Sequence, residues 1–425
     1  MGQHVVGSDE RFAAYIAGLS SVIGHADRVG PLRDYCVGLV MPAERKSVEP
    51  MAALTAPARV AAQHQSLLHF VGEGRWSDDK VLAKVRALVL PKIERHAPIE
   101  AWIIDDTGMP KQGRHSVGVA RQYCGQLGKQ DNCQVAVSLS LGNAHASLPV
   151  AYRLYLPQGW IDDAERRAKA GVPDDVTFMT KPQIALGQIQ AAHAADLPPG
   201  TVLMDAGYGV DAKLRMGVSA LGLAYVAGVL PNTLAWKPGT QPAAETAAPK
   251  KGRRDDSDIA SLKEIALKLS KKAWRRIEWR QGTCDVLVSR FARVRIQVAH
   301  RHTTTTDRAD EWLLVEWPKG ETEPAKYWLS TLPEDIGFAK LVETTKLRWR
   351  IERDYHDLKQ EVGLGHYEGR GWRGFHHHAT LCIAAYGFLI SEREAIPPSR
   401  PRRGGIISQP ALPQDWRPRG AAPQT

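Results

Sequence analysis

The N-terminal part of the chain carries apolar side chains at three- and four-residue spacing. RFAAYIAGLSSVI (11–23) and SDDKVLAKVRALVLPKI (77–93) both show it, and this spacing places the apolar residues on one face of a helix. Ser77, followed by two aspartates, is a typical helix N-terminus, and Pro91 is expected to end or kink that helix. The pattern predicts a helical N-terminal domain over residues 1–97.

The period of the pattern changes after Ile99, where short apolar or alternating runs replace the helical spacing. Runs with this strand-like character are AWIID (101–105), CQVAVSLSLG (133–142), SLPVAYRLYLP (147–157), TVLMD (201–205) and LAYVAGVL (223–230). Helical patterns over 181–195 and 211–222 separate the last three runs. Strands that alternate with helices after an antiparallel start predict a mixed sheet with helices on its faces.

Residues 231–333 interrupt this alternation. The first part, 231–260, is rich in Pro, Ala, Gly and charged residues, which is typical of a mobile loop. The later part alternates like hairpin strands in segments 274–300, 310–320 and 326–332. We therefore expect a β-rich insertion over residues 231–333.

The last part of the pattern is again helical. FAKLVETTKLRWRIERDYHDLKQEVGLG (338–365) predicts one long amphipathic helix that ends at Gly363, and FHHHATLCIAAYGFLI (375–390) predicts another. Residues 98–230 and 334–394 are then expected to form one α/β core. Residues 395–425, rich in Pro, Arg and Gly, predict a disordered tail.

Composition narrows the class of protein. The 425 residues carry a net charge of +10, which suggests a polyanionic partner, although a basic surface alone would give the same charge. There is no apolar run of membrane-spanning length and no secretory signal. The five cysteines are scattered and odd in number, so we expect reduced thiols and a cytoplasmic location, without a membrane partner.

The stretch IIDDTG (103–108) admits two interpretations. Asp-Thr-Gly is the active-site triplet of pepsin-like proteases, which need two such loops because two aspartates share one proton. The other candidate, Asp205-Ala206-Gly207, lacks the hydroxyl residue, so an aspartic protease is only a remote alternative. In the other interpretation an apolar strand delivers a carboxylate to a metal ion.

Asp105 and Asp205 share a second property, since each ends a short apolar strand. Carboxylates at strand ends in a mixed sheet can converge on one spot, and their oxygens are the hard ligands that Mg²⁺ and Mn²⁺ prefer. Each aspartate taken alone is equally explained as a turn or helix-capping residue.

Five residues of the long C-terminal helix, three of them charged, fall on one stripe at steps of three and four: Arg348, Glu352, Tyr355, Lys359 and Val362. Such a stripe suits a protein that binds phosphates beside a metal site. The alternative is a solvated helix face with intrahelical ion pairs, Glu352 with Arg348 and Asp354 with Arg350.

Arg348, Glu352 and Lys359 also have the spacing of a known signature. The chain resembles bacterial insertion-sequence transposases of the Asp-Asp-Glu class, whose signature is Tyr, two residues, Arg, three residues, Glu, six residues and Lys. The tyrosine position holds Thr345 here. TKPQIAL (180–186), VLMDAGYG (202–209), GLGHYEGRGWRGFHHH (363–378) and the run that begins at Asp105 are similar too, so the resemblance covers roughly residues 10–390.

The resemblance implies an RNase H-like fold, which retroviral integrases share: a mixed five-stranded sheet with flanking helices and a β-rich insertion before the last catalytic helix. It further implies that Asp105, Asp205 and Glu352 are the catalytic and metal-binding residues, with Asp106 as the alternative first ligand. The cofactor implied is a pair of Mg²⁺ ions, for which Mn²⁺ can substitute.

The resemblance also implies DNA as the substrate. Arg348 and Lys359 would bind phosphates near the cut, and Trp328, with neighbouring Tyr327, would stack on a flipped base. Trp236 is the competing aromatic residue, and packing in the core is the alternative for either. The expected partners are double-stranded DNA with terminal inverted repeats, target DNA and a second copy of the chain. Two alternatives stay open: a nuclease of the same fold that does not join DNA, and a DNA-binding remnant that no longer catalyses.

Overall fold

The computed structural model describes residues 7–238, 259–281, 286–299 and 310–395. The predicted tail, apart from Ala395, lies outside the described residues, as does most of the predicted mobile loop. The predicted domain boundaries stay predictions. The elements themselves are described below from the N-terminus onward.

Five helices form the N-terminal part of the chain, as predicted. They are α1 (Ser8–Ser20), α2 (Val29–Val40), α3 (Val48–Thr55), α4 (Val60–Gly72) and α5 (Asp78–Ile93). Ser77 caps α5, since its hydroxyl accepts a hydrogen bond from the amide of Lys80. Pro91 lies inside the last turn of α5, so the helix ends two residues beyond it.

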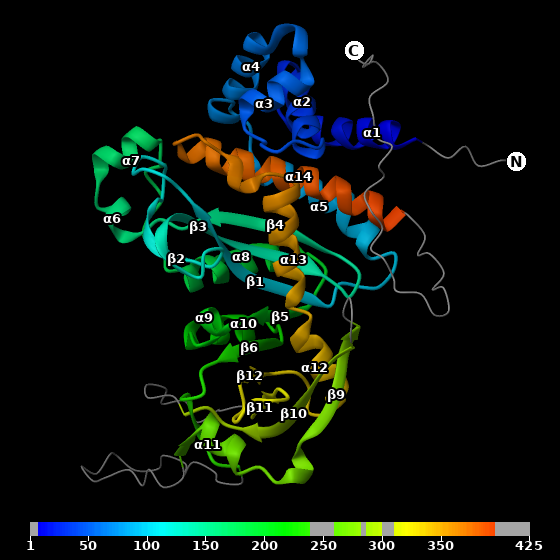
Figure 1. Ribbon diagram of the computed structural model, residues 1–425, viewed down its shortest axis with the longest axis vertical. Coiled ribbons are helices and arrows are strands. Elements are labelled where there is room, and N and C mark those ends of the chain that lie inside the picture. The colour runs from blue at the N-terminus through cyan, green and yellow to red at the C-terminus, as the bar shows by residue number, and fades with distance from the viewer. Residues whose placement is uncertain (1–6, 239–258, 282–285, 300–309, 396–425) are drawn as a thin grey trace, which may run out of the picture.

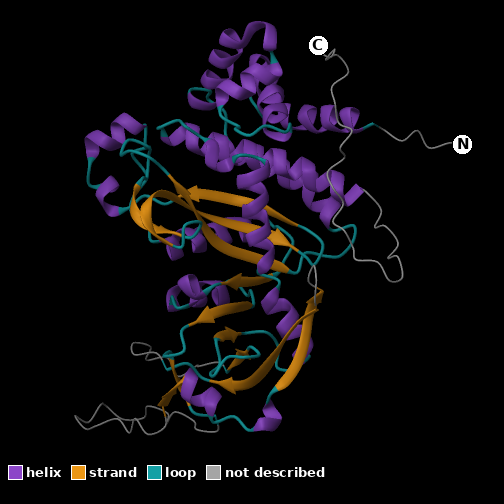
Figure 2. Cartoon of the chain, viewed as in Figure 1, coloured by secondary structure: helices purple, strands orange, loops and turns teal. Residues whose placement is uncertain are grey.

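A ten-stranded mixed sheet runs through the rest of the molecule, with helices on its faces (Figures 1 and 2). Its strands are β1 (Ala101–Pro110), β2 (Ala120–Cys124), β3 (Lys129–Gly142), β4 (Ser147–Leu154), β5 (Thr201–Met204), β6 (Tyr225–Val229), β9 (Arg275–Gln281), β10 (Val286–Ile296), β11 (Glu311–Trp317) and β12 (Lys326–Ser330). A separate two-stranded sheet pairs β7 (Leu234–Trp236) with β8 (Ile259–Ser261).

Five strands of the large sheet have the predicted RNase H-like arrangement. Strand β3 is antiparallel to both β1 and β4, whereas β5 is parallel to β1 and β6 is parallel to β5. The order is therefore β4-β3-β1-β5-β6, with Asp105 on the first strand and Asp205 directly after β5. This confirms the predicted fold class.

The sheet is larger than the five strands predicted, because the later strands continue it. Strand β12 pairs antiparallel with β6, and β11, β10 and β9 follow in order. Pairing of β6 with β12 satisfies backbone groups that would otherwise form an exposed edge. The helices among these strands are α6 (Gln158–Ile161), α7 (Ala164–Ala170), α8 (Lys181–Ala194), α9 (Ala206–Gly209), α10 (Ala212–Ala220) and α11 (Leu262–Leu267).

The region predicted as one long helix is divided into three pieces. Helix α12 (Phe338–Lys346) is followed by a turn at Leu347 and Arg348, then by α13 (Trp349–His356) and the π-helical turn η5 (Asp357–Glu361). Gly363 has a φ of +79°, the left-handed conformation that commonly ends a helix. Figure 1 shows α13 lying across one face of the sheet.

Helix α14 (Trp372–Ala395) is the packing centre of the helical part. Sixteen of its residues are buried, and its Tyr386 and Phe388 belong to an apolar cluster that extends from α1 through α5 to the sheet. Figure 1 shows α14 beside α5 and below α2, α3 and α4. In the described part of the chain, α14 included, no helix combines the length and apolar character that crossing a membrane requires.

Candidate active site

The alternation of side chains along two parallel strands places two acids on the same face of the sheet. Ile103 on β1 and Leu203 on β5 pack in one cluster with Ile351 of α13. Since side chains alternate in direction along a strand, Asp105 and Asp205, two residues further on, lie on this same face. The face is the one that α13 covers.

Arg348 brings these two acids together with the third predicted residue. Its Nη2 lies 2.6 Å from Oδ2 of Asp105 and 3.7 Å from Oδ2 of Asp205. Its Nη1 lies 3.6 Å from Oε1 of Glu352, one helical turn away. The pair between Arg348 and Glu352 is therefore present, but as one part of a cluster that also includes Asp105, inside β1, and Asp205, directly after β5.

The three acids differ in their exposure to solvent. Asp105 is the most buried, with 15% of its side chain exposed, against 41% for Asp205 and 70% for Glu352. Burial raises the pKa of Asp105 to about 7; the charge of Arg348 opposes this rise and that of Asp205 adds to it. The cluster thus has a buried end and an open end that a large ligand can reach.

Asp205 is held by its place at a helix start and by a close contact between two glycines. Its Oδ1 accepts a hydrogen bond from the amide of Tyr208 and so caps α9. A Cβ atom on Gly209 would lie 2.0 Å from the carbonyl oxygen of Gly228 on β6. Only glycine allows α9 to approach β6 this closely, and this approach sets the position of Asp205.

Asp106 points to the opposite face of the sheet. Its Oδ2 lies 3.1 Å from Nζ of Lys181 and accepts a hydrogen bond of 3.0 Å from the hydroxyl of Tyr208. Of the two neighbouring aspartates, Asp105 is therefore the one that shares Arg348 with the other acids. The Asp-Thr-Gly triplet lies inside β1, not in the loop that a pepsin-like site requires.

The chemistry of this cluster fits a divalent metal site. Three carboxylates supply hard oxygen ligands, and the guanidinium of Arg348 stands where their negative charges converge. In the ranges that the structure describes, no three acidic, histidine or cysteine side chains are already spaced to hold a metal ion.

The residues at two further positions of the signature, Lys359 and Thr345, make hydrogen bonds within the protein. Nζ of Lys359 donates hydrogen bonds to the carbonyl of Gly108 (2.8 Å) and to Oε1 of Gln126 (3.3 Å). Lys359 lies in the π-helical turn, so the stripe predicted from regular spacing is shifted beyond α13. Thr345, at the tyrosine position, is buried and donates its hydroxyl to the carbonyl of Leu341.

Asp354 lies in the interior and not on the solvated helix face that spacing suggested for it. Its side chain is buried, and its Oδ1 accepts hydrogen bonds from the hydroxyls of Ser147 (2.7 Å) and Tyr386 (3.0 Å). Tyr355, one residue on, is also buried and shares a 2.9 Å hydrogen bond with Ser138 on β3. These contacts fix α13 against the sheet, which in turn fixes Glu352.

Tyr327 and Trp328 point to opposite faces of β12. Tyr327 is buried, and its hydroxyl donates to the carbonyl of Pro324. Trp328 is half-buried on the face that carries the acids, and packs against the apolar cluster under α13. Its ring centre lies 5.2 Å from Nζ of Lys346, the residue that ends α12.

Lys346 is a residue of this region that the sequence reasoning missed. Besides Trp328 it faces the rings of Trp279 and Phe291, 4.8 and 5.4 Å from their centres, and it pairs with Glu316 at 2.6 Å. Strands β9 to β12 thus hold the end of α12, two residues before Arg348. The alternation of aromatic residues in the insertion was the only signal for it in the sequence.

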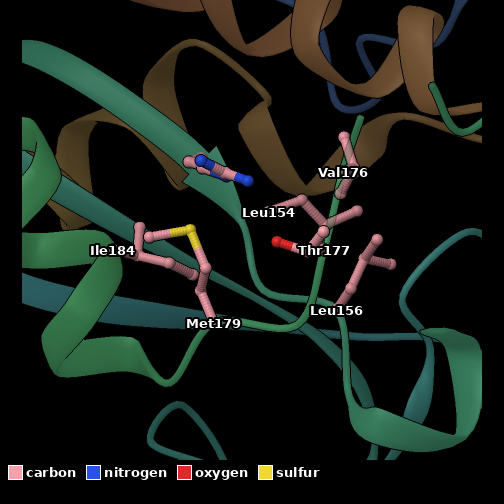
Figure 3. Close-up of a pocket in the computed structure, with 7 residues that line it drawn as sticks. Leu154, Leu156, Val176, Thr177, Met179 and Ile184 are labelled. Atoms are coloured by element: carbon pink, nitrogen blue, oxygen red, sulfur yellow. The ribbon is translucent and has the colours of Figure 1, made fainter. Parts of the chain in front are cut away.

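The candidate site is open to solvent on the side of Glu352. The pocket drawn in Figure 3 lies elsewhere and includes none of the three acids. It is lined by Arg153, Leu154, Leu156, Val176, Thr177, Met179 and Ile184. An open site of this kind suits a polymer substrate better than a small molecule.

Comparison with known proteins shows which family the chain belongs to. Residues 18–285 match the family described as DDE superfamily endonuclease; this range includes Asp105 and Asp205 and ends before Glu352. Over 197 residues the chain is 29% identical to the "Probable transposase for insertion sequence element IS701" of Microchaete diplosiphon. The alignment covers 46% of this chain and 47% of that relative, so it spans about half the length of each.

Proposed function

Because the chain belongs to the DDE superfamily of endonucleases, we propose that it is the DNA transposase of an insertion sequence. The observation that carries the proposal is the convergence of Asp105, Asp205 and Glu352 on one guanidinium. These acids come from β1, the end of β5 and α13, which lie far apart in the sequence. The similarity to a probable insertion-sequence transposase supports the proposal.

Asp105, Asp205 and Glu352 would hold two divalent cations, Mg²⁺ or Mn²⁺. A bound pair of such ions acts as a Lewis acid and stabilises both the attacking and the leaving oxygen of a phosphodiester. The exposed side chain of Glu352 lies at the open end of the cluster, so a DNA backbone can approach the acids from that side. Asp105 would provide the buried ligand at the other end.

The basic residues beside the acids would bind the DNA backbone. Arg348 and Lys359 lie on either side of Glu352 along the chain, and each can neutralise a phosphate near the cut. Trp328 shares this face of the sheet, so it is better placed than the buried Tyr327 to stack on an unpaired base. The net charge of +10 agrees with a DNA partner.

The reaction needs no covalent bond between protein and DNA. In the first step water attacks a phosphorus atom at the end of the element, the bond from phosphorus to the 3′-oxygen breaks, and a 3′-hydroxyl is left. In the second step this hydroxyl attacks a phosphorus atom of target DNA, and the 3′-oxygen there leaves. Two copies of the chain, each holding one terminal inverted repeat, would bring both ends to one target.

The test is cleavage and joining of labelled duplexes that carry the ends of the element, in Mg²⁺, Mn²⁺ or EDTA. We expect Asp105→Asn, Asp205→Asn and Glu352→Gln to bind these duplexes but not to cut them. Glu343→Gln, which changes an exposed glutamate of α12, is the matched control and should cut normally.

The outcomes separate the alternative functions. Cleavage without joining would identify a nuclease, whereas binding without cleavage by the unaltered chain would identify an inactive remnant. Cleavage that persists in the acid variants would contradict the assignment of the site.

A further inference from the structure

The contacts of Arg348 do not satisfy its guanidinium group completely. Nη1 and Nη2 face the three acids, but Nε is buried without a hydrogen-bond partner among the described residues. A buried N–H group without a partner is unfavourable. One donor of the guanidinium is therefore left over beside the acids.

The oxygens that contact Arg348 are those that a metal ion would need. Oδ2 of both Asp105 and Asp205 and Oε1 of Glu352 all lie within 3.7 Å of its nitrogens. A divalent cation bound by the same oxygens would be a few ångströms from the guanidinium, and like charges at that distance repel strongly in a partly buried site. Arg348 and the metal therefore compete for one set of ligands.

The chain offers a way for the guanidinium to leave. Arg348 lies in the turn between α12 and α13, where the helical hydrogen bonding is interrupted. About a fifth of its side chain is already exposed, and the acid nearest to solvent, Glu352, is its neighbour on α13. Rotation of the side chain toward solvent would carry the positive charge to the surface where DNA is expected.

Resting on the proposed function, we propose that Arg348 is an exchangeable counter-ion that couples metal binding to DNA binding. With the acids alone it neutralises their charge; when divalent cations bind, it moves to a DNA phosphate. Without DNA, binding of the metal leaves Arg348 without an anionic partner, which lowers the affinity for the metal. With DNA, a phosphate takes the place of the acids, so each ligand raises the affinity for the other by the same factor.

This exchange and a permanent structural role predict opposite signs for one measurement. If Arg348 competes with the metal, its removal raises metal affinity in the absence of DNA. If Arg348 holds the acids together, its removal lowers that affinity. The first test is a titration of the full chain with Mn²⁺ in the absence of DNA. The electron paramagnetic resonance signal of free Mn²⁺ measures how much of the ion is bound at each step.

We expect Arg348→Gln to bind Mn²⁺ roughly tenfold more tightly than the unaltered chain, which corresponds to about 1.4 kcal/mol. Arg353→Gln is the matched control, because Arg353 belongs to the same helix but pairs with Asp357. It should bind Mn²⁺ like the unaltered chain. If Arg348→Gln does not fold, Arg348→Lys takes its place. This variant keeps the positive charge, so we expect a smaller gain in Mn²⁺ affinity.

The second test measures the coupling from the DNA side. Ca²⁺ should raise the affinity of the unaltered chain for a fluorescein-labelled duplex, measured by anisotropy, and should raise that of Arg348→Gln less. Equal or weaker Mn²⁺ binding by Arg348→Gln would overturn the exchange. The same titration of Asp105→Asn and Glu352→Gln then shows which proposal has failed. If these variants no longer bind Mn²⁺, the metal site is supported and only the exchange of Arg348 is wrong. If they still bind Mn²⁺, the proposed metal site itself is wrong.

Discussion

Lys346 and Glu316 form a 2.6 Å ion pair between α12 and β11, with only 11% and 7% of their side chains exposed. Burial lowers the pKa of Lys346, and the charge of Glu316 opposes this shift. The three aromatic rings around the ammonium group add cation–π attraction. The pair therefore attaches the inserted strands to the helix that leads into the candidate site.

Replacing Lys346 with Met should leave Glu316 buried and unpaired, and lower the free energy of unfolding by about 3–5 kcal/mol. Adding Glu316→Gln should recover part of this loss, because the unpaired charge is removed as well. Urea unfolding of the single and double variants measures the effect. Lys340→Met breaks the exposed pair with Glu100 and should cost less than about 1 kcal/mol; a similar cost at Lys346 would contradict the buried-pair interpretation.

Gly209→Ala should weaken both the fold and cleavage. Its new methyl group would meet the carbonyl oxygen of Gly228 at 2.0 Å, so α9 must move away from β6 and take Asp205 with it. We expect a lower melting temperature, intact DNA binding and loss of most cleavage. Gly187→Ala in α8, where nothing lies within 4 Å, should instead stabilise the chain by about 0.5–1 kcal/mol. Unchanged cleavage by Gly209→Ala would show that Asp205 is not positioned in this way.

Asp105 and Asp106 should respond differently to the same change. Asp105→Asn removes an acid that contacts Arg348 and should abolish cleavage. Asp106→Asn keeps an acceptor for the Tyr208 hydroxyl and loses only the partly exposed ion pair with Lys181, so cleavage should survive with a stability loss of up to about 1 kcal/mol. The reverse outcome in a cleavage assay would make Asp106 the first ligand.

His378 should make stability depend on pH in the acid range. Its Nε2 donates to the carbonyl of Gly363 and its Nδ1 accepts from the hydroxyl of Tyr35, so the neutral ring is satisfied. Burial lowers its pKa to about 4. The unfolded chain binds this proton near pH 6.5, so the stability from His378 is complete above that value and is lost as pH falls toward 4.

The measurement compares His378→Gln with the unaltered chain by urea unfolding. The variant should have a lower free energy of unfolding than the unaltered chain near pH 7.5. The difference between the two free energies should be smaller by about 2 kcal/mol near pH 5. Comparing the two chains at each pH cancels other titrating groups, such as Asp78, whose pKa burial raises to about 7. His69→Gln, at an exposed position of α4, controls for the loss of a histidine. A gap that stays constant at His378 would contradict a neutral buried ring.

The elements that carry the acids could be predicted from local pattern. Alternation along β1 and β5 is a local property, so the apolar runs before Asp105 and Asp205 were sufficient to predict the strand segment that precedes each acid. Asp205 follows the end of β5 as predicted. The prediction that Asp105 ends its strand was wrong, because pairing with β3 continues β1 to Pro110. The order of strands and helices predicted a mixed sheet with helices on its faces, and the resemblance to transposases implied the RNase H-like form of it. Glu352 was predicted from the resemblance of Arg348, Glu352 and Lys359 to the transposase signature, since spacing alone also allowed a solvated helix face.

The remaining features depend on contacts that spacing does not encode. Regular periodicity predicted one helix from 338 to 363, but the contacts of Arg348 and the π-helical turn η5 divide it. The pairing of β12 with β6 joins residues about a hundred positions apart, and local alternation contains no information about such a partner. The groups around Lys346 come from four strands, β9 to β12, and local alternation does not predict that they meet at one lysine either.

The place of α14 has a consequence for how the protein is made. The helices α1, α2, α4 and α5, synthesised first, bury their apolar faces against a helix that begins only at Trp372. While the ribosome is still translating, the apolar surface that α14 will cover has no native partner, and nascent chains with exposed apolar surface are prone to aggregate. We therefore expect chaperones to bind this surface during translation, and a product interrupted before α14 to be degraded.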